Sequence, residues 1–239
     1  MASDNTFDRS ASTYAEELHK GVGLSGERSD YFAEARVAWL ARRLETVDPV
    51  VNISRVMDFG CGIGGSFGYL KEAFGLSHLV GIDTSTESLD IAEAQARDLD
   101  VAFAGYSRAE DGSEVDLAFS NGTFHHILPE ERAGCIQDIY RCLRPGGYVA
   151  VWENNPLSIP ARIVMSKIPF DADAIMVPHA ELKRLFVEVG FELVRTDFRF
   201  YFPRTLAILR PLEHLLIKFP FGAQYQVLAR KRKLSEDRA

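Results

Sequence analysis

The sequence predicts an α/β fold in which helices cover both faces of a mostly parallel β-sheet. Two observations predict it. Strand signals alternate with helix signals from residue 55 to residue 153, and a glycine-rich loop directly follows the first strand. The length of 239 residues, with 46% hydrophobic and 26% charged residues, suits one soluble α/β domain with a modest elaboration.

The alternating elements are short and bounded by turn residues. Apolar runs predict strands over 55–59, 78–83, 101–106, 115–120 and 148–153. Apolar residues at helical spacing predict helices over 65–74, 85–98 and 130–143. Each helix thus connects two strands, as in βαβ units with right-handed crossovers.

The regions on either side of this core have different patterns. Residues 1–45 predict a helical cap with helices near 11–19 and over 29–44. After the core, the sequence predicts an irregular stretch over 156–177 and an amphipathic helix over 180–189. It then predicts a hairpin with strands over 191–202 and 224–229, and the apolar run 205–219 interrupts this hairpin. The chain is therefore predicted as a single domain over 1–239, with a cap (1–45), a cofactor-binding core (50–155) and a substrate-side elaboration (156–233).

Charge and cysteine content restrict the functional class. The net charge of -7 argues against nucleic-acid binding, although residues 178–233 carry a net charge of +6. Three cysteines without a Cys-x-x-Cys pair indicate a reduced, cytoplasmic setting. The sequence begins with no apolar signal segment and contains no apolar run long enough for a membrane span.

The glycine loop is the strongest functional signal, and it fits two kinds of cofactor. Gly60, Gly62 and Gly65 satisfy the dinucleotide pattern G-x-G-x-x-G, while Gly60, Gly62 and Gly64 satisfy G-x-G-x-G. Asp83, about twenty residues further on, can bind ribose hydroxyls in either case. The glycines alone do not distinguish an NAD-dependent oxidoreductase from an enzyme that uses S-adenosylmethionine.

Asp58 separates the two cofactors. This residue lies two positions before Gly60, where a dinucleotide would place its pyrophosphate. A carboxylate there repels a pyrophosphate but attracts the ammonium and sulfonium charges of S-adenosylmethionine. A purely structural role, in which Asp58 accepts backbone N–H bonds of the loop, remains compatible with this interpretation.

The sequence resembles the class I S-adenosylmethionine-dependent methyltransferases in four ordered motifs. These are Val56-Met-Asp-Phe-Gly-Cys-Gly-Ile-Gly64, Gly81-Ile-Asp83, the segment 116–127 with its two histidines, and Leu143-Arg-Pro-Gly-Gly-Tyr-Val-Ala-Val151. The resemblance covers about residues 14–231. It implies a Rossmann-like three-layer sandwich with a seven-stranded, mostly parallel sheet and an antiparallel last strand.

The resemblance also implies a set of cofactor-binding residues for S-adenosyl-L-methionine. They are Asp58, Gly60, Cys61, Gly62, Gly64, Asp83, Thr84, Tyr106, Ser107, Ser120 and Asn121. The sequence departs from the family after the third strand, where an acid usually binds the adenine. Here Tyr106 and Ser107 occupy that place, so the adenine contacts are inferred by substitution.

Candidate catalytic residues follow the fourth strand, where ligands bind in open α/β sheets. His125 and His126 lie there, and histidine is the natural base near neutral pH. We favour His126 as the base, and the resemblance implies Tyr14 as its partner. Tyr31, Glu153 and Asn154 are candidate substrate-binding residues. Because no His, Cys, Asp or Glu residues show metal-ligand spacing, we expect a metal-independent in-line displacement.

The acceptor is less closely defined. We expect an oxygen or nitrogen atom of a small molecule, a glycan or a lipid-linked sugar, bound by a monomer or a homodimer. The apolar segment 203–220 carries three basic residues between two prolines. It predicts a peripheral membrane contact, a dimer interface, or a helix packed on the sheet edge. The alternative functions are an NAD-dependent oxidoreductase and a non-catalytic cofactor-binding protein.

Overall fold

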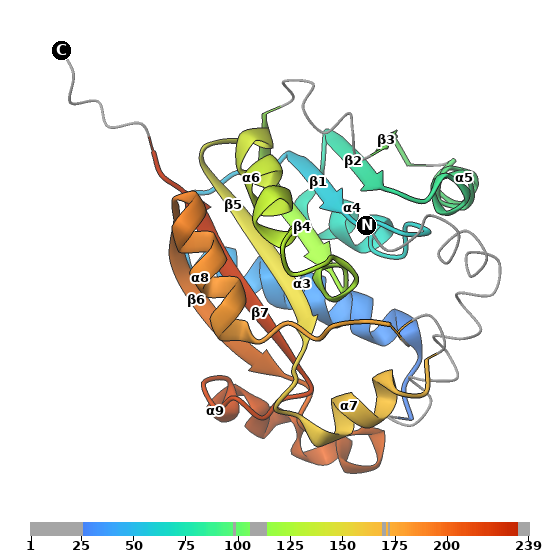
Figure 1. Ribbon diagram of the computed structural model, residues 1–239, viewed down its shortest axis with the longest axis vertical. Coiled ribbons are helices and arrows are strands. Elements are labelled where there is room, and N and C mark those ends of the chain that lie inside the picture. Colours follow the sequence, from blue (N-terminus) through green and yellow to red (C-terminus); the bar gives the residue numbers. More distant parts are fainter. Residues whose placement is uncertain (1–25, 98, 106–113, 169–170, 172, 234–239) are drawn as a thin grey trace.

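The computed structural model describes residues 26–97, 99–105, 114–168, 171 and 173–233. Its centre is a seven-stranded sheet with the strand order β3-β2-β1-β4-β5-β7-β6 (Figure 1). The strands are β1 (Arg55–Phe59), β2 (His78–Asp83), β3 (Val101–Gly105), β4 (Val115–Asn121), β5 (Leu143–Asn154), β6 (Phe191–Arg199) and β7 (Gln224–Lys231). The first five strands pair in parallel, and β7 is antiparallel to both β5 and β6, which confirms the predicted sheet.

Helices cover both faces of this sheet, so the core has two halves. On one face pack α3 (Ser29–Val47), α4 (Phe67–Phe74) and α5 (Thr86–Gln95), and on the other pack α6 (Arg132–Cys142) and α8 (His179–Val189). Successive strand residues serve opposite faces: Val149 packs with α6 and α8, whereas Tyr148 and Ala150 pack with α3 and α4. The three-layer sandwich follows from this alternation.

The order of the strands positions the functional site. Because β1 lies between β2 and β4, the chain leaves β1 towards one side of the sheet and later returns to its other side. Such a switch point opens a crevice beyond the carboxyl ends of the strands, which is where open α/β sheets bind ligands. The glycine loop after β1 and the two histidines after β4 both lie at this edge.

Several predicted boundaries were wrong. α4 begins at Phe67 rather than at residue 65, because Gly64 has a positive φ of 82° and the chain is still turning there. The stretch 156–177, predicted to be irregular, contains the helix α7 (Ile159–Met165), whose N-cap Ser158 accepts a hydrogen bond from the Ala161 N–H. The last strand of the core, predicted over 148–153, already begins at Leu143 in the long strand β5.

For the apolar segment after β6, one of the three alternatives was a helix packed on the sheet edge, and the structure differs from it. It forms the 3₁₀ segment η5 (Arg204–Leu212), in which no residue is buried, and the four-residue helix α9 (Glu213–Leu216). Pro211 lies inside η5 near its end and cannot donate a backbone hydrogen bond, so one continuous α-helix cannot form. Buried Glu213 anchors the segment by accepting hydrogen bonds from the N–H groups of Tyr201 and Phe202.

Among the residues that the structure describes, none of the helices combines the length and the apolar character needed to cross a bilayer.

Candidate active site

A large cavity lies at the carboxyl ends of β1, β2, β4 and β5. Its volume is about 1160 Å³, and its wall includes the glycine loop, the histidine turn after β4, and residues of α3, α7 and the β6–η5 loop. Pockets for one drug-sized ligand usually measure about 300–1,000 Å³. The cavity therefore has room for a nucleoside cofactor and an acceptor together.

The glycine loop has the backbone shape that close approach of a ligand requires. Gly60 and Gly62 both have positive φ angles, of 73° and 51°. A Cβ atom on Gly60 would collide with the side chain of Thr123, whereas one on Gly62 would meet no protein atom within 4 Å. Gly60 is therefore required for internal packing, and Gly62 exposes bare backbone to the cavity that it lines.

Two carboxyl groups flank this loop and differ in their partners. Asp83 accepts hydrogen bonds from the N–H groups of Gly62 (2.8 Å) and Ser85 (3.0 Å), which fixes the loop against the end of β2. Asp58 lines the cavity and is 2% exposed. Burial, together with the nearby charge of Asp83, raises the pKa of Asp58 to about 8. A cationic ligand group beside Asp58 would favour its ionised form, so these residues fit S-adenosylmethionine.

We expect cofactor binding to be coupled to ionisation of Asp58. With a pKa of about 8, this carboxyl is mostly protonated at neutral pH, and a bound ammonium group would lower its pKa and release the proton. The affinity for S-adenosylhomocysteine should therefore rise between about pH 6 and pH 8, by up to about tenfold per pH unit, and level off above pH 8. Titration calorimetry in buffers of different ionisation enthalpy measures the released proton directly.

Asp58→Asn is the control for this prediction, because asparagine cannot titrate. The variant should bind S-adenosylhomocysteine more weakly and without proton release. Equal proton release by both proteins would show that another group is responsible.

The structure places three of the seven other predicted cofactor residues on the cavity wall. Cys61, Thr84 and Asn121 line the cavity. Ser120 does not; it is 1% exposed inside β4, because neighbouring strand residues point to opposite faces. Gly64 packs against the Phe67 ring instead of lining the cavity. Tyr106, Ser107 and the predicted catalytic Tyr14 lie outside the described residues.

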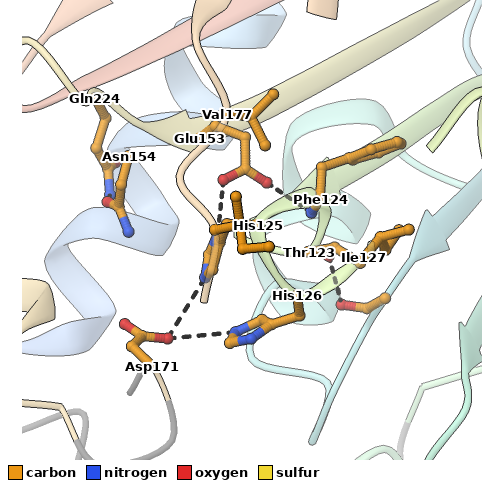
Figure 2. A network of polar contacts seen from close by, with 12 residues as sticks. Thr123, Phe124, His125, His126, Ile127, Glu153, Asn154, Asp171, Val177 and Gln224 are labelled. Carbon is orange, nitrogen blue, oxygen red and sulfur yellow. Dashed lines mark hydrogen bonds and ion pairs between the residues drawn. The ribbon is translucent and has the colours of Figure 1, made fainter. Parts of the chain in front are cut away.

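The two histidines lie in the short 3₁₀ turn η3 (Phe124–His126), directly after β4. Glu153, near the end of the adjacent strand β5, holds this turn with both carboxylate oxygens (Figure 2). One oxygen accepts the Phe124 N–H at 2.7 Å, and the other lies 2.6 Å from His125 Nδ1. Glu153 was predicted to bind substrate; it lines the cavity, and its buried carboxylate also organises the turn.

Asp171 connects the two histidine rings, and the sequence analysis did not identify it. Its Oδ1 atom lies 3.4 Å from His125 Nε2 and 3.3 Å from His126 Nε2 (Figure 2). Burial by itself lowers the pKa of His125, but the carboxylates of Glu153 and Asp171 outweigh it and raise this pKa to about 10. Burial and the charge of His125 lower the pKa of His126. At neutral pH the site thus holds a charged His125 beside a neutral His126.

This difference predicts two distinct NMR titrations. The His125 ring should stay doubly protonated to about pH 9, because its pKa is about 10, while His126 should be neutral at pH 7. Two-bond ¹H–¹⁵N spectra distinguish these states of an imidazole ring. Glu153→Gln removes one of the two carboxylate charges and should bring the His125 transition to lower pH. Loss of the His125 proton below about pH 8 in the unmodified protein would contradict the assignment.

Arg132 at the start of α6 is a second residue that the sequence analysis missed. Its side chain is 1% exposed and binds both sides of the histidine turn. Nε donates to the carbonyl oxygens of Phe124 (3.2 Å) and Ile127 (3.1 Å), and the terminal nitrogens donate to the Ile175 carbonyl (2.8 Å) and Glu181 (2.7 Å). Arg132 therefore joins the turn to the segment that leads into α8.

A chain of polar side chains reaches the cavity from the opposite side. Arg36 of α3 donates from Nε to the Gln224 side-chain oxygen at 2.9 Å, and Gln224 donates from Nε2 to Asn154 Oδ1 at 3.0 Å. All three residues line the cavity. Because the Asn154 oxygen accepts this bond, its amide nitrogen is the group oriented to donate to a ligand. Asn154, predicted from sequence, is thus joined by two residues from distant elements.

Tyr31 forms part of the aromatic wall. Its ring packs edge-on against Phe32 and Phe200, and the Arg210 guanidinium lies 4.8 Å from the ring centroid. Tyr31, Phe32 and Phe200 line the cavity, and Tyr31 was predicted from the sequence as a substrate-binding residue. Trp39, also in α3, is buried in the core, where the guanidinium groups of Arg43 and Arg199 lie over its ring.

The structure brings together three groups that could hold a metal ion, although the sequence showed no metal-ligand spacing. Ligand atoms of His125, His126 and Asp171 lie within 4.8 Å of one another. Glu153 binds His125 Nδ1, so the Nε2 atom of the same ring either carries a proton towards Asp171 or can bind a metal ion. Chelation of metal from the enzyme separates the two possibilities.

Comparisons with known proteins agree with this geometry. A family model described as "Methyltransferase domain" matches residues 57–151. A trans-aconitate 2-methyltransferase of Acidovorax sp. (strain JS42) is 31% identical over 182 residues, which are 70% of this chain and 69% of that protein. A trans-aconitate 2-methyltransferase of Azoarcus sp. (strain BH72) is 29% identical over 138 residues. This match covers 58% of the chain and 53% of that relative, so the chain spans about half of its length.

Solved structures show the same fold. A crystal structure of an S-adenosylmethionine-dependent methyltransferase from Mesorhizobium loti aligns with a TM-score of 0.59 and 18% identity, covering 83% of this chain and all of that one. A magnesium protoporphyrin IX methyltransferase from Synechocystis with bound SAH aligns with a TM-score of 0.60 and 16% identity, covering 89% and 86% of the two chains.

The fold and the glycine loop with its two acids define a Rossmann-like enzyme that uses S-adenosylmethionine. The chain belongs to the class I S-adenosylmethionine-dependent methyltransferases. The oxidoreductase that the glycines alone allowed is thereby rejected.

Proposed function

We propose that this methyltransferase acts on a protic oxygen or nitrogen atom of a small-molecule, glycan or lipid-linked acceptor, with His126 as the base. S-adenosylmethionine supplies a methyl group that is already activated as a sulfonium. The protein's remaining tasks are to align the acceptor, to exclude water and to take up its proton. The observation that carries the proposal is the position of His126 on the wall of the cavity that also contains the glycine loop, with its Nε2 atom 3.3 Å from Asp171.

The network around His126 supports the role of a base. If its Nε2–H points to Asp171, the neutral ring carries its basic lone pair on Nδ1. The charged ring of His125 lies at 4.1 Å between ring centroids and disfavours a second positive charge in the resting site. A base with a pKa below its ordinary value is fully available at neutral pH.

The rest of the cavity wall supports an acceptor with both polar and apolar parts. The Asn154 amide, oriented through Gln224 and Arg36, offers a hydrogen-bond donor. Apolar side chains of α7 and the aromatic group around Phe200 line other parts of the cavity. The named relatives that methylate trans-aconitate support a small-molecule acceptor. A carboxylate acceptor needs no base, however, and the presence of His126 favours a hydroxyl or an amine.

The test is turnover with panels of acceptors. The purified protein would be incubated with S-adenosylmethionine and, separately, polycarboxylic acids, sugars and nucleotide sugars, lipid-linked sugars and small amines, and formation of S-adenosylhomocysteine would be measured. The proposal expects turnover with a hydroxyl or amine acceptor. If the protein methylated only carboxylates, the proposed role of His126 as a base would be contradicted.

The same assay tests the predicted independence of metal. We expect EDTA to leave turnover unchanged, because the sulfonium of the cofactor is already activated and needs no metal ion as a Lewis acid. Loss of turnover in EDTA, restored by one divalent metal, would instead assign His125, His126 and Asp171 to a bound cation.

A further inference from the structure

We propose that the mouth of the cavity is a docking face for an anionic lipid surface. This entrance face consists of residues 157–168, which contain α7, and residues 203–221, which contain η5 and α9. Both segments lie at the same end of the molecule (Figure 1). Ile163 and Phe221, one from each segment, line the cavity and are also exposed to solvent, so they mark its rim.

Apolar side chains are concentrated on this face. Nine of the thirteen large hydrophobic residues that are exposed in the described part of the chain belong to it. They are Leu157, Ile159, Ile163, Leu206, Ile208, Leu212, Leu215, Phe219 and Phe221. Ile208 is 87% exposed and Leu215 is 74% exposed. Exposed apolar groups gathered at one site mark an interaction surface, whereas isolated ones are ordinary.

The charge of the entrance face identifies the partner. The two segments contain five basic residues, Arg162, Lys167, Arg204, Arg210 and Lys218, and a single acid, Glu213, which is buried beside Arg199. Arg210 pairs with Glu27 and Lys218 with Asp197. Within the described residues no ion pair joins Arg162, Lys167 or Arg204 to an acid, so these three carry the positive charge of the face. The whole protein has a net charge of -7, so this face differs in sign from the rest. Apolar side chains interspersed with lysine and arginine are the pattern of segments that lie in the interface of an anionic membrane.

The local structure of η5 agrees with its partial insertion into a lipid surface rather than with its packing onto the protein core. None of the nine residues of η5 is buried. Two prolines and the buried Glu213 hold the segment in shape without covering its apolar side chains. A second copy of the chain would cover the face less well, because a two-fold symmetric contact would place these basic patches against each other.

Docking of this face would place the cavity mouth directly at the lipid surface. An acceptor carried by a lipid could then enter between α7 and η5 without crossing water. Docking itself does not depend on which atom is methylated, and it is measured without turnover. Its failure would therefore leave the proposed reaction intact.

The experiment is flotation with vesicles of phosphatidylcholine, with and without phosphatidylglycerol. We expect the protein to float with the anionic vesicles only, and less at high salt, because screening weakens attraction between charged surfaces. The variant Ile208→Ser with Leu215→Ser should reduce binding about tenfold or more. Neither residue lines the cavity, so affinity for S-adenosylhomocysteine should stay unchanged and show that the variant is folded.

Val50→Ser is the matched control. Val50 is 90% exposed but precedes β1, at the edge of the sheet opposite to the cavity. It should bind vesicles like the unmodified protein. Absence of flotation, or flotation that the double variant does not reduce, would overturn the proposal. So would a dimer in light scattering that the double variant dissociates, because a second copy would then cover the face.

Discussion

Replacing His126 by glutamine is expected to lower kcat by about 10²- to 10⁴-fold, the usual contribution of a general base. Glutamine retains a polar side chain that can donate to Asp171 but cannot accept a proton from the acceptor. Because His126 is not needed to hold the glycine loop, binding of S-adenosylhomocysteine and thermal stability should change little. Single-turnover rates and titration calorimetry measure the two effects separately.

The pH profile gives an independent readout of the same residue. The pKa of His126 is lowered from its ordinary 6.5, so kcat at saturating S-adenosylmethionine should be flat at and above neutral pH and fall only at lower pH. The acid limb should disappear from the residual activity of His126→Gln. His78→Gln, at the start of β2 and away from the cavity, is the control and should retain full kcat. If kcat of His126→Gln differed less than twofold from that of the unmodified protein, the acceptor would lose no proton to this ring.

Replacing Arg132 by methionine is expected to have the largest effect on stability. Methionine fills much of the same volume but leaves three carbonyl oxygens and the Glu181 carboxylate without their donor. Removing one partner from such a buried charged network typically costs about 3–5 kcal/mol. Urea denaturation, monitored by circular dichroism, gives the change in the free energy of unfolding.

Arg184→Met in α8 is the matched control for this stability effect. Arg184 also pairs with a glutamate, Glu188, but its side chain is exposed, and such pairs contribute about 1 kcal/mol or less. If Arg132→Met cost no more than this control, the arginine would not be what holds the histidine turn. Folded Arg132→Met protein should also show a lower kcat, because η3 carries both histidines.

His126 and Arg132 belong to different parts of the candidate site, and only His126 could be identified from the sequence. His126 follows a strand at a place where ligands bind in α/β sheets, so its position along the chain was informative. Arg132 and Asp171 occur in segments without a distinctive pattern. Their role depends on contacts with the two histidines, Ile175 and Glu181, and spacing along the chain does not encode such contacts.

The role of Glu153 depends on contacts that only the structure shows. From sequence it was a polar residue at the end of a strand near the acceptor. In the structure it accepts a backbone N–H and pairs with His125, which makes His125 a stable cation and leaves His126 as the candidate base. The preference for His126 over His125 thus acquires a physical basis that the sequence could not provide.

By itself, the sequence determined the strand and helix alternation of the core, the glycine loop and the acids Asp58 and Asp83. These features are local, because glycine conformation, apolar periodicity and the residues that follow a strand are set within a few positions of the chain. The tertiary structure alone decided which polar groups meet in the cavity and which apolar groups remain outside. Asp171 reaches the histidines, Gln224 reaches Asn154, and the apolar segment 203–221 stays largely exposed, because burial and charge pairing are settled between residues far apart in sequence.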